Sequence, residues 1–575
     1  MITYRQMFSR RLNLVVVVLV VVSLGLLLRL MAIQFQLDPD ELAYLQGLAS
    51  SAYTRLREYR PTRGQIYDRD GELLAVNTVE YSVGVSPSLI TDPVEAARQL
   101  AVALNIDEME LYNILNTDDQ WALLAPRVSA AVGQAVEDLD IYGTQVDPIP
   151  RRAYPQGSLA AQVLGFVNYD LQGYYGVEGR YQSDLAGESL IGEESNIPFE
   201  ISASVAPRYG SDIVLTIDRD VQYLIEQTLA EAVASTGSEG GTIIVMNPSN
   251  GEILAMASYP TYDPNTFYEL ADEQLVNPAI SEQYEPGSVF KVITMAAAIE
   301  EGVILPNSTY NDQASIQCGG LTIWNWDRQA HGLIDMTTAL VQSLNVGAST
   351  VAIDMGPVRF YREVEAFGFG TPTRVDLQGE ESGILLVPSS EGWRDGNLCT
   401  NSFGQGLAVT PLQMLTAINA IANGGLIMQP HVVYQIVDGD NVYTTQPASR
   451  GRPISTETAR LIRDMMVQVV EFGVPAAQVE GYTIAGKTGT AEIPIPGGYE
   501  ADSSIVTFVG FFPADDPQVS VLIKLDRPDE YWGSIVAAPI FSELAEQLAI
   551  LLEIPPDAVR HTLTSQGGNV SAVDR

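Results

Sequence analysis

The residues EPGSVFK at positions 285–291 form the most informative stretch of this sequence. They make a turn that leads directly into the apolar run Val289 to Ile299, which is too hydrophobic for a surface helix. The spacing of three places Ser288 and Lys291 on one helical face, about 5–6 Å apart at Cβ. Because burial disfavours an ammonium group, a lysine in this run can act as the base that activates the serine. Taken alone, the pair could also be an N-cap serine followed by an ordinary lysine.

Two further short motifs carry polar groups of the same kind. Ser343-Leu344-Asn345 follows the helical run Met336 to Gln342 and supplies a hydroxyl and an amide before a second helix. The motif KTGT at 487–490 ends a strand with a cation, two hydroxyls and a glycine whose missing Cβ lets a ligand backbone approach closely. Each motif alone is also compatible with an ordinary helix end or a polar hairpin end. The candidate catalytic and substrate-binding residues are Ser288, Lys291, Ser343 and Asn345, and Lys487, Thr488, Gly489 and Thr490.

Strand patterns flank this region on both sides. A hairpin is predicted at 242–258 around Asn250-Gly251, and three later strands are predicted at 482–488, 504–512 and 519–525. A long helical insertion separates the hairpin from the later strands. The expected fold of this half is therefore α+β, with a sheet of about five strands covering a helical cluster.

The N-terminus carries a candidate membrane anchor. The apolar run from Leu12 to Leu28 is long enough to span a bilayer, and Arg29 can snorkel so that the span extends to Ile33. Arginines precede the run and acidic residues follow it, which places the N-terminus inside and nearly all of the chain outside the cytoplasm. A cleaved signal peptide is the alternative, although no small-x-small cleavage site follows the run. We therefore expect a single-pass protein of the plasma or inner membrane.

Five segments follow from these patterns. Residues between the anchor and the catalytic half alternate short strand-like runs with polar helical ones, so a mixed α/β pedestal is expected there, with a hairpin around Asp70-Gly71. The residues after Pro555 are polar and are expected to be disordered. The predicted segments are a cytoplasmic tail at 1–11, the anchor at 12–33, the pedestal at 37–235, the catalytic domain at 236–552 and a disordered tail at 553–575.

Composition excludes several classes of protein. The formal charge of −40 would repel nucleic acid, so no nucleic-acid partner is expected. Two cysteines and three scattered histidines give no metal-ligand spacing, so no metal and no cofactor are expected. The shortage of histidine and the absence of a G-x-S-x-G elbow also weaken a Ser-His-Asp hydrolase. Because Cys318 and Cys399 would lie on the oxidising side of the membrane, we expect them to form a disulfide.

In the order S-x-x-K, S-x-N, K-T-G, the three motifs together resemble the penicillin-recognising serine transferases. Only three lysines occur in the chain, and two of them fall in these motifs. The segments RGQIYDRDG at 63–71 and FGQGL at 403–407 resemble those of class B penicillin-binding proteins. Further matches to this family are Leu74-Ala75, Arg152, Tyr154, Pro155, Gly157, Gly176, Glu178, Leu185, Gly187, 215–218 and 409–413.

The resemblance implies a peptidoglycan D,D-transpeptidase with a five-stranded antiparallel sheet flanked by helices. Ser288 would be acylated by the D-alanyl-D-alanine stem peptide, Lys291 would be the base, and Ser343 would relay a proton to the departing D-alanine. Asn345 would hold the amide of the acyl donor. β-Lactams would be covalent inhibitors.

The same resemblance assigns the strand motif to the donor carboxylate. Lys487 and the hydroxyls of Thr488 and Thr490 would receive it, and the backbone N–H groups of Ser288 and Thr490 would form the oxyanion hole. A membrane glycosyltransferase of the shape, elongation, division and sporulation family would supply the glycan strands. The S-x-N and FGQGL motifs slightly favour a division-type member of the family over an elongation-type member.

Three alternatives share this fold. A secreted β-lactamase would be about half as long and would lack the anchor and the pedestal. A bifunctional class A enzyme would need a glycosyltransferase domain where RGQIYDRDG stands. A β-lactam sensor would need a cytoplasmic domain, and only about eleven residues precede the apolar run.

Overall fold

The computed structural model describes residues 4–35, 54–59, 61–188, 190–195 and 208–565. The chain divides into two compact units. The first contains residues 1–61 and 187–209, and the second contains residues 62–186 and 210–575. Every predicted site residue belongs to the second unit.

The first unit contains the helix predicted as the anchor. Helix α1 runs from Tyr4 to Phe35, and its segment Leu12–Ala32 is long and apolar enough to cross a membrane, with a mean hydropathy of 2.9. Strand β1 (Thr54–Tyr59) pairs antiparallel with β8 (Leu190–Ser195). The structure therefore confirms an apolar helix of spanning length where the sequence predicts one.

A five-stranded sheet lies at the centre of the second unit. Its strand order is β11-β10-β22-β21-β20, and every neighbouring pair is antiparallel. Almost all residues of β10, β11 and β22 are buried, so helices must cover both faces. The predicted five-stranded antiparallel sheet is confirmed. Its strands are β10 (Gly240–Met246), β11 (Ile253–Tyr259), β20 (Ala485–Ile495), β21 (Gly498–Phe512) and β22 (Val519–Asp526).

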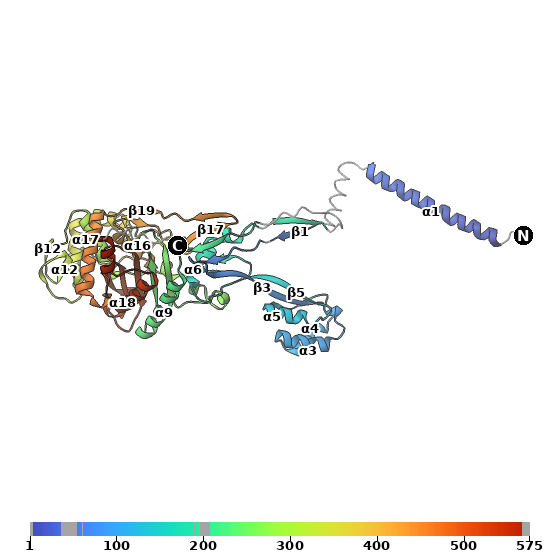
Figure 1. Ribbon diagram of the computed structural model, residues 1–575, viewed down its shortest axis with the longest axis horizontal. Helices are drawn as coiled ribbons and strands as arrows, with labels where there is room; N and C mark the ends of the chain where they lie inside the picture. The colour runs from blue at the N-terminus through green and yellow to red at the C-terminus, as the bar shows by residue number, and fades with distance from the viewer. Residues whose placement is uncertain (1–3, 36–53, 60, 189, 196–207, 566–575) are drawn as a thin grey trace. The chain divides into compact units, whose positions relative to one another are not determined.

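Helices α9 (Arg219–Thr236) and α18 (Gly533–Leu551) contact each other and this sheet, and both are labelled in Figure 1. Gln222 on α9 donates from Nε2 to the carbonyl of Met256 at 2.9 Å and accepts the Met256 N–H at 2.8 Å. Helix α9, which begins before the predicted start of the catalytic domain at residue 236, therefore packs against the catalytic sheet. Helix α18 is also apolar enough to span a membrane, but it is half buried here as a core helix.

The predicted helical insertion forms the other cluster against the sheet. Helix α11 (Phe290–Glu300) is fully buried except at its end, which agrees with the apolar run in the sequence. Contacts join it to the helices around it. These are α13 (Asn345–Met355), α14 (Pro357–Ala366), α15 (Asp395–Ser402), α16 (Pro411–Ala422) and α17 (Thr456–Gln468), and α12 (Met336–Val341) in turn contacts α13 and α17.

A second sheet holds the pedestal together. The predicted hairpin at Asp70-Gly71 is present, because β2 (Ile66–Tyr67) pairs antiparallel with β3 (Leu73–Val85). The strand order is β18-β17-β9-β2-β3-β4, with β5 also paired to β3, so two strands from the C-terminal half join the pedestal strands. The other strands are β4 (Ala122–Val128), β5 (Thr144–Ala153), β9 (Asp212–Leu215), β17 (Val433–Asp438) and β18 (Asn441–Thr444).

Helices cover one side of β3 and β5, as Figure 1 shows in blue and cyan. They are α3 (Pro93–Leu104), α4 (Glu108–Leu115) and α5 (Ala130–Glu137). The short elements of the second unit are α6 (Ala161–Leu164), β6 (Phe166–Val167), β7 (Gly173–Tyr174), α7 (Gly176–Arg180), α8 (Gln182–Ala186), α10 (Pro278–Ser281), β12 (Thr309–Asp312), β13 (Ser315–Cys318), β14 (Leu321–Trp324), β15 (Gly332–Asp335), β16 (Ile427–Met428) and β19 (Ser449–Gly451).

A buried ion cluster lies in the pedestal. Glu178 on α7 has no exposed surface and receives Arg63 Nε at 2.8 Å and Arg152 Nε at 2.7 Å. The Arg63 guanidinium also donates to the Glu178 backbone carbonyl. Burial alone would raise the pKa of Glu178, but the two guanidiniums outweigh it and hold that pKa below its ordinary value.

The predicted disorder of residues 553–575 is wrong over the part that the structure describes. Helix α19 spans Asp557–Ser565. The Tyr482 hydroxyl donates to the carbonyl of Ile554 at 2.6 Å, and the Asp557 N–H donates to the carbonyl of Gly481 at 2.9 Å. The apolar side chain of Ile554 is also buried in the core. These contacts together hold the segment in place. Residues 566–575 lie outside the described residues.

Candidate active site

The nucleophile turn (residues 285–288) holds Ser288 at the entrance of α11. Residues Gly287–Val289 form a 3₁₀ turn that runs into the helix. Gly287 has φ +54°, and a Cβ there would lie 2.7 Å from the carbonyl oxygen of Thr490, so this position requires glycine. The turn therefore lies directly against the KTGT strand.

Lys291 lies between two serine side chains. Its Nζ is 3.0 Å from Ser288 Oγ and 3.2 Å from Ser343 Oγ, and it donates to the Ser343 carbonyl. The side chain is almost completely buried, with a relative exposure of 1%. Burial and the nearby Lys487 ammonium lower the pKa of Lys291 well below its ordinary value. The predicted pairing of Ser288 with Lys291 is present as geometry.

Ser343 occupies the loop between α12 and α13. Its backbone has φ +57°, a conformation that costs a non-glycine residue energy and that here turns the hydroxyl toward both lysines. The Leu344 N–H donates to the carbonyl of Ala339 at 2.9 Å, which fixes the loop to the end of α12. The sequence around Ser343 does not indicate this left-handed backbone conformation.

Lys487, on strand β20, also reaches the Ser343 hydroxyl. Its Nζ lies 3.1 Å from Ser343 Oγ and 3.0 Å from the carbonyl of Thr488. Burial lowers the pKa of Lys487 to about 7. Strand β20 and helix α11 thus bring two buried lysines to one serine hydroxyl, and no carboxylate bonds either amine in the described part of the chain.

The other residues of the strand motif have distinct surroundings. Thr488 is partly exposed, and the Thr490 hydroxyl accepts the N–H of Gly533 at 3.1 Å. A Cβ on Gly489 would lie 2.9 Å from the carbonyl oxygen of Pro286 and from a methyl of Val289. The sequence interpretation assigned this space to a ligand backbone, whereas the nucleophile turn occupies it.

Asn345 begins α13 and is anchored to a neighbouring hairpin. Its Nδ2 donates to the carbonyl of Trp324 at 3.0 Å, and the Val346 N–H donates to Asn325 Oδ1 at 3.1 Å. Trp324 ends β14, which pairs with β13. The β13–β14 hairpin therefore holds the S-x-N loop in place, a role that the sequence reading did not assign to it.

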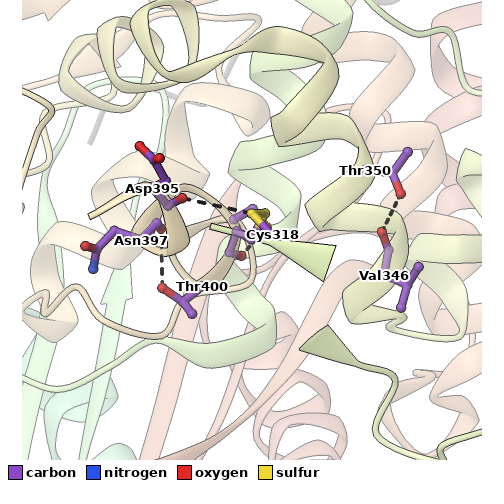
Figure 2. Close-up of a disulfide and its surroundings, with 8 residues drawn as sticks. Cys318, Val346, Thr350, Asp395, Asn397 and Thr400 are labelled. Atoms are coloured by element: carbon purple, nitrogen blue, oxygen red, sulfur yellow. Dashed lines mark hydrogen bonds between the residues drawn. A yellow bond between two sulfur atoms is a disulfide. The ribbon is translucent and has the colours of Figure 1, made fainter. Parts of the chain in front are cut away.

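The predicted disulfide between Cys318 and Cys399 is confirmed. Figure 2 shows the sulfur bridge beside Asp395, Asn397 and Thr400 of α15, with Val346 and Thr350 of α13 nearby. It joins β13 to α15, which lie 81 residues apart in the sequence. The bridge links the hairpin that supports Asn345 to the helix that leads into the FGQGL segment.

Several residues near the site were missed. Glu285 accepts the N–H of Gly406 at 2.9 Å and the Tyr499 hydroxyl at 3.3 Å, and burial raises its pKa to about 7. Trp326 donates from Nε1 to the carbonyl of Gln342 at 3.0 Å, and its ring contacts that of Trp532 with centroids 5.5 Å apart. For Trp326, the sequence signal that could have identified it is the triplet Trp-Asn-Trp at 324–326, which precedes the S-x-N motif.

The arrangement suits acyl transfer through a serine. A serine hydroxyl at the start of a helix lies beside an amine whose proton affinity is reduced, and a second hydroxyl connects that amine to a second lysine. Among the described residues, no group of three or more histidines, cysteines and carboxylates is close enough to hold a metal ion.

Family models agree with this architecture. The penicillin binding protein transpeptidase domain matches residues 241–546, and the penicillin-binding protein dimerisation domain matches residues 58–193. Among solved structures, penicillin binding protein 3 from Mycobacterium tuberculosis in complex with aztreonam is 30% identical with a TM-score of 0.69. That match covers 87% of this chain and 98% of the other.

Relatives of known name are similar along most of the chain. Stage V sporulation protein D of Bacillus subtilis (strain 168) is 34% identical over 89% of this chain and 82% of its own length. Peptidoglycan D,D-transpeptidase FtsI of Escherichia coli (strain K12) is 30% identical over 94% of this chain and 92% of its own length. With one family model matching more than half of the residues and these relatives matched over four fifths of their length or more, the chain belongs to the class B penicillin-binding proteins.

Proposed function

We propose that the protein is a peptidoglycan D,D-transpeptidase that cross-links stem peptides through an acyl-enzyme at Ser288. The observation that carries the proposal is the position of Lys291 Nζ, 3.0 Å from Ser288 Oγ and shielded from water. Burial and the neighbouring Lys487 lower the pKa of Lys291, which makes its neutral, proton-accepting form more accessible.

In the acylation step, Lys291 takes the Ser288 proton and Oγ attacks the carbonyl carbon of the penultimate D-alanine. The N–H groups of Ser288 and Thr490 stabilise the oxyanion. The peptide C–N bond then breaks, and the departing D-alanine amine gains a proton through Ser343. The 3.2 Å separation between Lys291 Nζ and Ser343 Oγ supports this relay.

Binding of the donor peptide uses the KTGT motif of β20 and Asn345. Lys487, with Thr488 and Thr490, receives the terminal carboxylate, while Asn345 holds the donor amide. Burial lowers the pKa of Lys487 to about 7, and a bound carboxylate would favour its charged form, because an opposite charge nearby stabilises an ammonium. The acyl-enzyme is then resolved by the amine of a second stem peptide, which regenerates the Ser288 hydroxyl.

Covalent labelling by a fluorescent penicillin tests the acylation step. The wild-type chain should be labelled, and Ser288→Ala should remove the label because it takes away the hydroxyl that lies 3.0 Å from Lys291 Nζ at the entrance of α11. Ser249→Ala, an exposed serine after β10, is the matched control and should keep the label. A label that persists on Ser288→Ala refutes the serine acyl-enzyme.

Turnover with a D-alanyl-D-alanine donor and an added D-amino acid tests the acceptor step. A transpeptidase forms the exchanged peptide and releases D-alanine. A sensor would keep its acyl group, and a hydrolase would give only the shortened acid. Either of those outcomes contradicts the proposal.

The segment organisation supports a membrane setting. We propose that residues 12–33 anchor the chain in the plasma or inner membrane, that residues 1–11 lie in the cytoplasm, and that the pedestal and the catalytic domain lie outside it. The disulfide supports this orientation, because such bonds persist in oxidising compartments. Protease added to intact spheroplasts should digest the catalytic domain, and protection would overturn the orientation.

We further propose a polymerase partner, a membrane glycosyltransferase of the shape, elongation, division and sporulation family, and a role in division. The support is the match to the dimerisation-domain model and the family membership. A fluorescent fusion should gather at the septum and co-purify with that glycosyltransferase. Uniform labelling of the side wall would instead assign the protein to elongation.

A further inference from the structure

The third lysine of the chain lies outside the catalytic motifs. Lys524 is on β22 and has no exposed surface. Its Nζ lies 2.9 Å from Glu282 Oε2, also bonds Asp526, and lies 5.4 Å from the centroid of the Tyr284 ring. A buried ammonium requires such partners, because an unpaired buried charge is very costly.

The two carboxylates belong to different parts of the fold. Asp526 is two residues from Lys524 on the same strand, so that bond is local. Glu282 follows α10 and lies six residues before Ser288, so the Lys524–Glu282 bond joins the sheet to the segment that carries the nucleophile.

Strand register places Lys524 beneath that segment. Thr507 is opposite Lys524 on one side and opposite Gly489 on the other, so the three positions share one face of the sheet. The missing Cβ of Gly489 faces the carbonyl of Pro286. Lys524 therefore extends from the face on which the nucleophile turn packs.

The opposite side of the segment is held by backbone. The N–H of Tyr284 donates to the carbonyl of Val409, the N–H of Val409 donates back, and Gly287 donates to Gly404. Toward the end of the sheet, Glu282, Gln283 and Tyr284 border a cavity of about 450 Å³. Because that space is not packed, the bond to Lys524 limits movement of the segment in that direction.

We propose that Lys524 is a positioning residue for Ser288, acting through Glu282 to hold the nucleophile turn against the sheet. The inference rests on the proposed acylation of Ser288 and concerns its rate. Loss of the bond lets the segment move toward the cavity and takes Ser288 Oγ out of reach of Lys291, without removing any catalytic group.

A matched pair of variants of the full-length chain separates positioning from stability. Glu282→Gln removes the charge on the turn segment, and Asp526→Asn removes the same charge from the strand. Lys524→Met and the double variant Lys524→Met/Glu282→Gln complete a cycle. For each, benzylpenicillin acylation is resolved into an affinity and a first-order rate constant, and thermal midpoints are measured alongside.

Glu282→Gln and Lys524→Met should each lower the first-order rate constant by about tenfold, and the double variant should be no slower than the slower single variant. Asp526→Asn should stay within about twofold whatever its thermal midpoint. Acylation of Glu282→Gln within about twofold of wild type, or additive losses in the double variant, would overturn the inference. If Lys524→Met does not fold, the comparison of Glu282→Gln with Asp526→Asn decides alone. Failure of the proposed function would instead appear as an unlabelled wild-type chain.

Discussion

Two regions of this protein bury positive charge, and they do so in opposite ways. In the pedestal, the Arg63 and Arg152 guanidiniums both bond the Glu178 carboxylate. In the active site, the bonds of Lys291 and Lys487 go to hydroxyls and carbonyls. In the pedestal, the guanidiniums and the carboxylate stay charged. In the active site, burial lowers the pKa of both amines.

Both regions are buried, so burial alone does not explain the difference. The groups that bond a buried cation decide whether it stays charged and stabilises the fold or can lose its proton and act as a base. A guanidinium cannot lose its proton in a protein, and with a carboxylate it makes a permanent pair. An amine without a carboxylate partner is driven toward its neutral form, which can accept a proton. Four predictions can break or sharpen this distinction.

The largest effect is expected at Lys291. Lys291→Arg should slow β-lactam acylation by about 10²–10⁴-fold, as much as Lys291→Ala, because a guanidinium cannot act as the base. Second-order acylation rates for both variants measure this. If Lys291→Arg acylates within about tenfold of wild type, a barrier difference of about 1.4 kcal/mol, Lys291 is not the general base.

Glu178→Ala tests the pedestal cluster. Removing the carboxylate leaves two buried guanidiniums without a partner and should cost about 3–5 kcal/mol of unfolding free energy, while acylation by the folded fraction is unchanged. Chemical denaturation measures the loss. Glu95→Ala is the control, because its bond to Arg98 is exposed and its removal should leave stability nearly unaltered. Equal effects of the two substitutions would contradict the assignment of a structural role to the buried cluster.

Lys487 should tolerate arginine better than Lys291 does. Its proposed task needs only positive charge, so Lys487→Arg should retain measurable acylation, while Lys487→Ala should lose about 10–100-fold, the worth of one charge-assisted hydrogen bond. The same kinetic assay compares the two. An arginine variant as slow as the alanine variant would mean that the amine itself is required at this position.

The pH dependence of stability should show the smallest effect. The Lys487 pKa is about 7 in the folded chain against an ordinary value of 10.5, so the folded state binds fewer protons between these pH values and stability rises with pH there. Lys487→Met should therefore be stabilising near pH 7. This advantage should shrink by on the order of 1 kcal/mol per pH unit toward pH 9. Denaturant titrations at three pH values measure it, and a constant difference would argue against a lowered pKa.

Local patterns predicted the parts of this protein whose cause is local. The spacing of Ser288 and Lys291 follows from helical periodicity, and the hairpin at Asp70-Gly71 follows from turn chemistry. Helix α19 was missed because its residues are polar. Its order comes from contacts with Gly481 and Tyr482, more than 70 residues earlier, which no local window contains.

The sequence, through its motif order and its scarcity of lysine, was sufficient to identify the candidate site residues, since residue type and helical spacing are local properties. Only tertiary structure could place Ser343 between lysines that lie 52 and 144 residues away, and give Gly489 its neighbour in the nucleophile turn. It also decided that, among the described residues, no carboxylate bonds Lys291 or Lys487, while two bond Lys524. The physical reason is that the pKa of a buried amine depends on the groups that long-range packing brings to it, and those groups are distant in the chain.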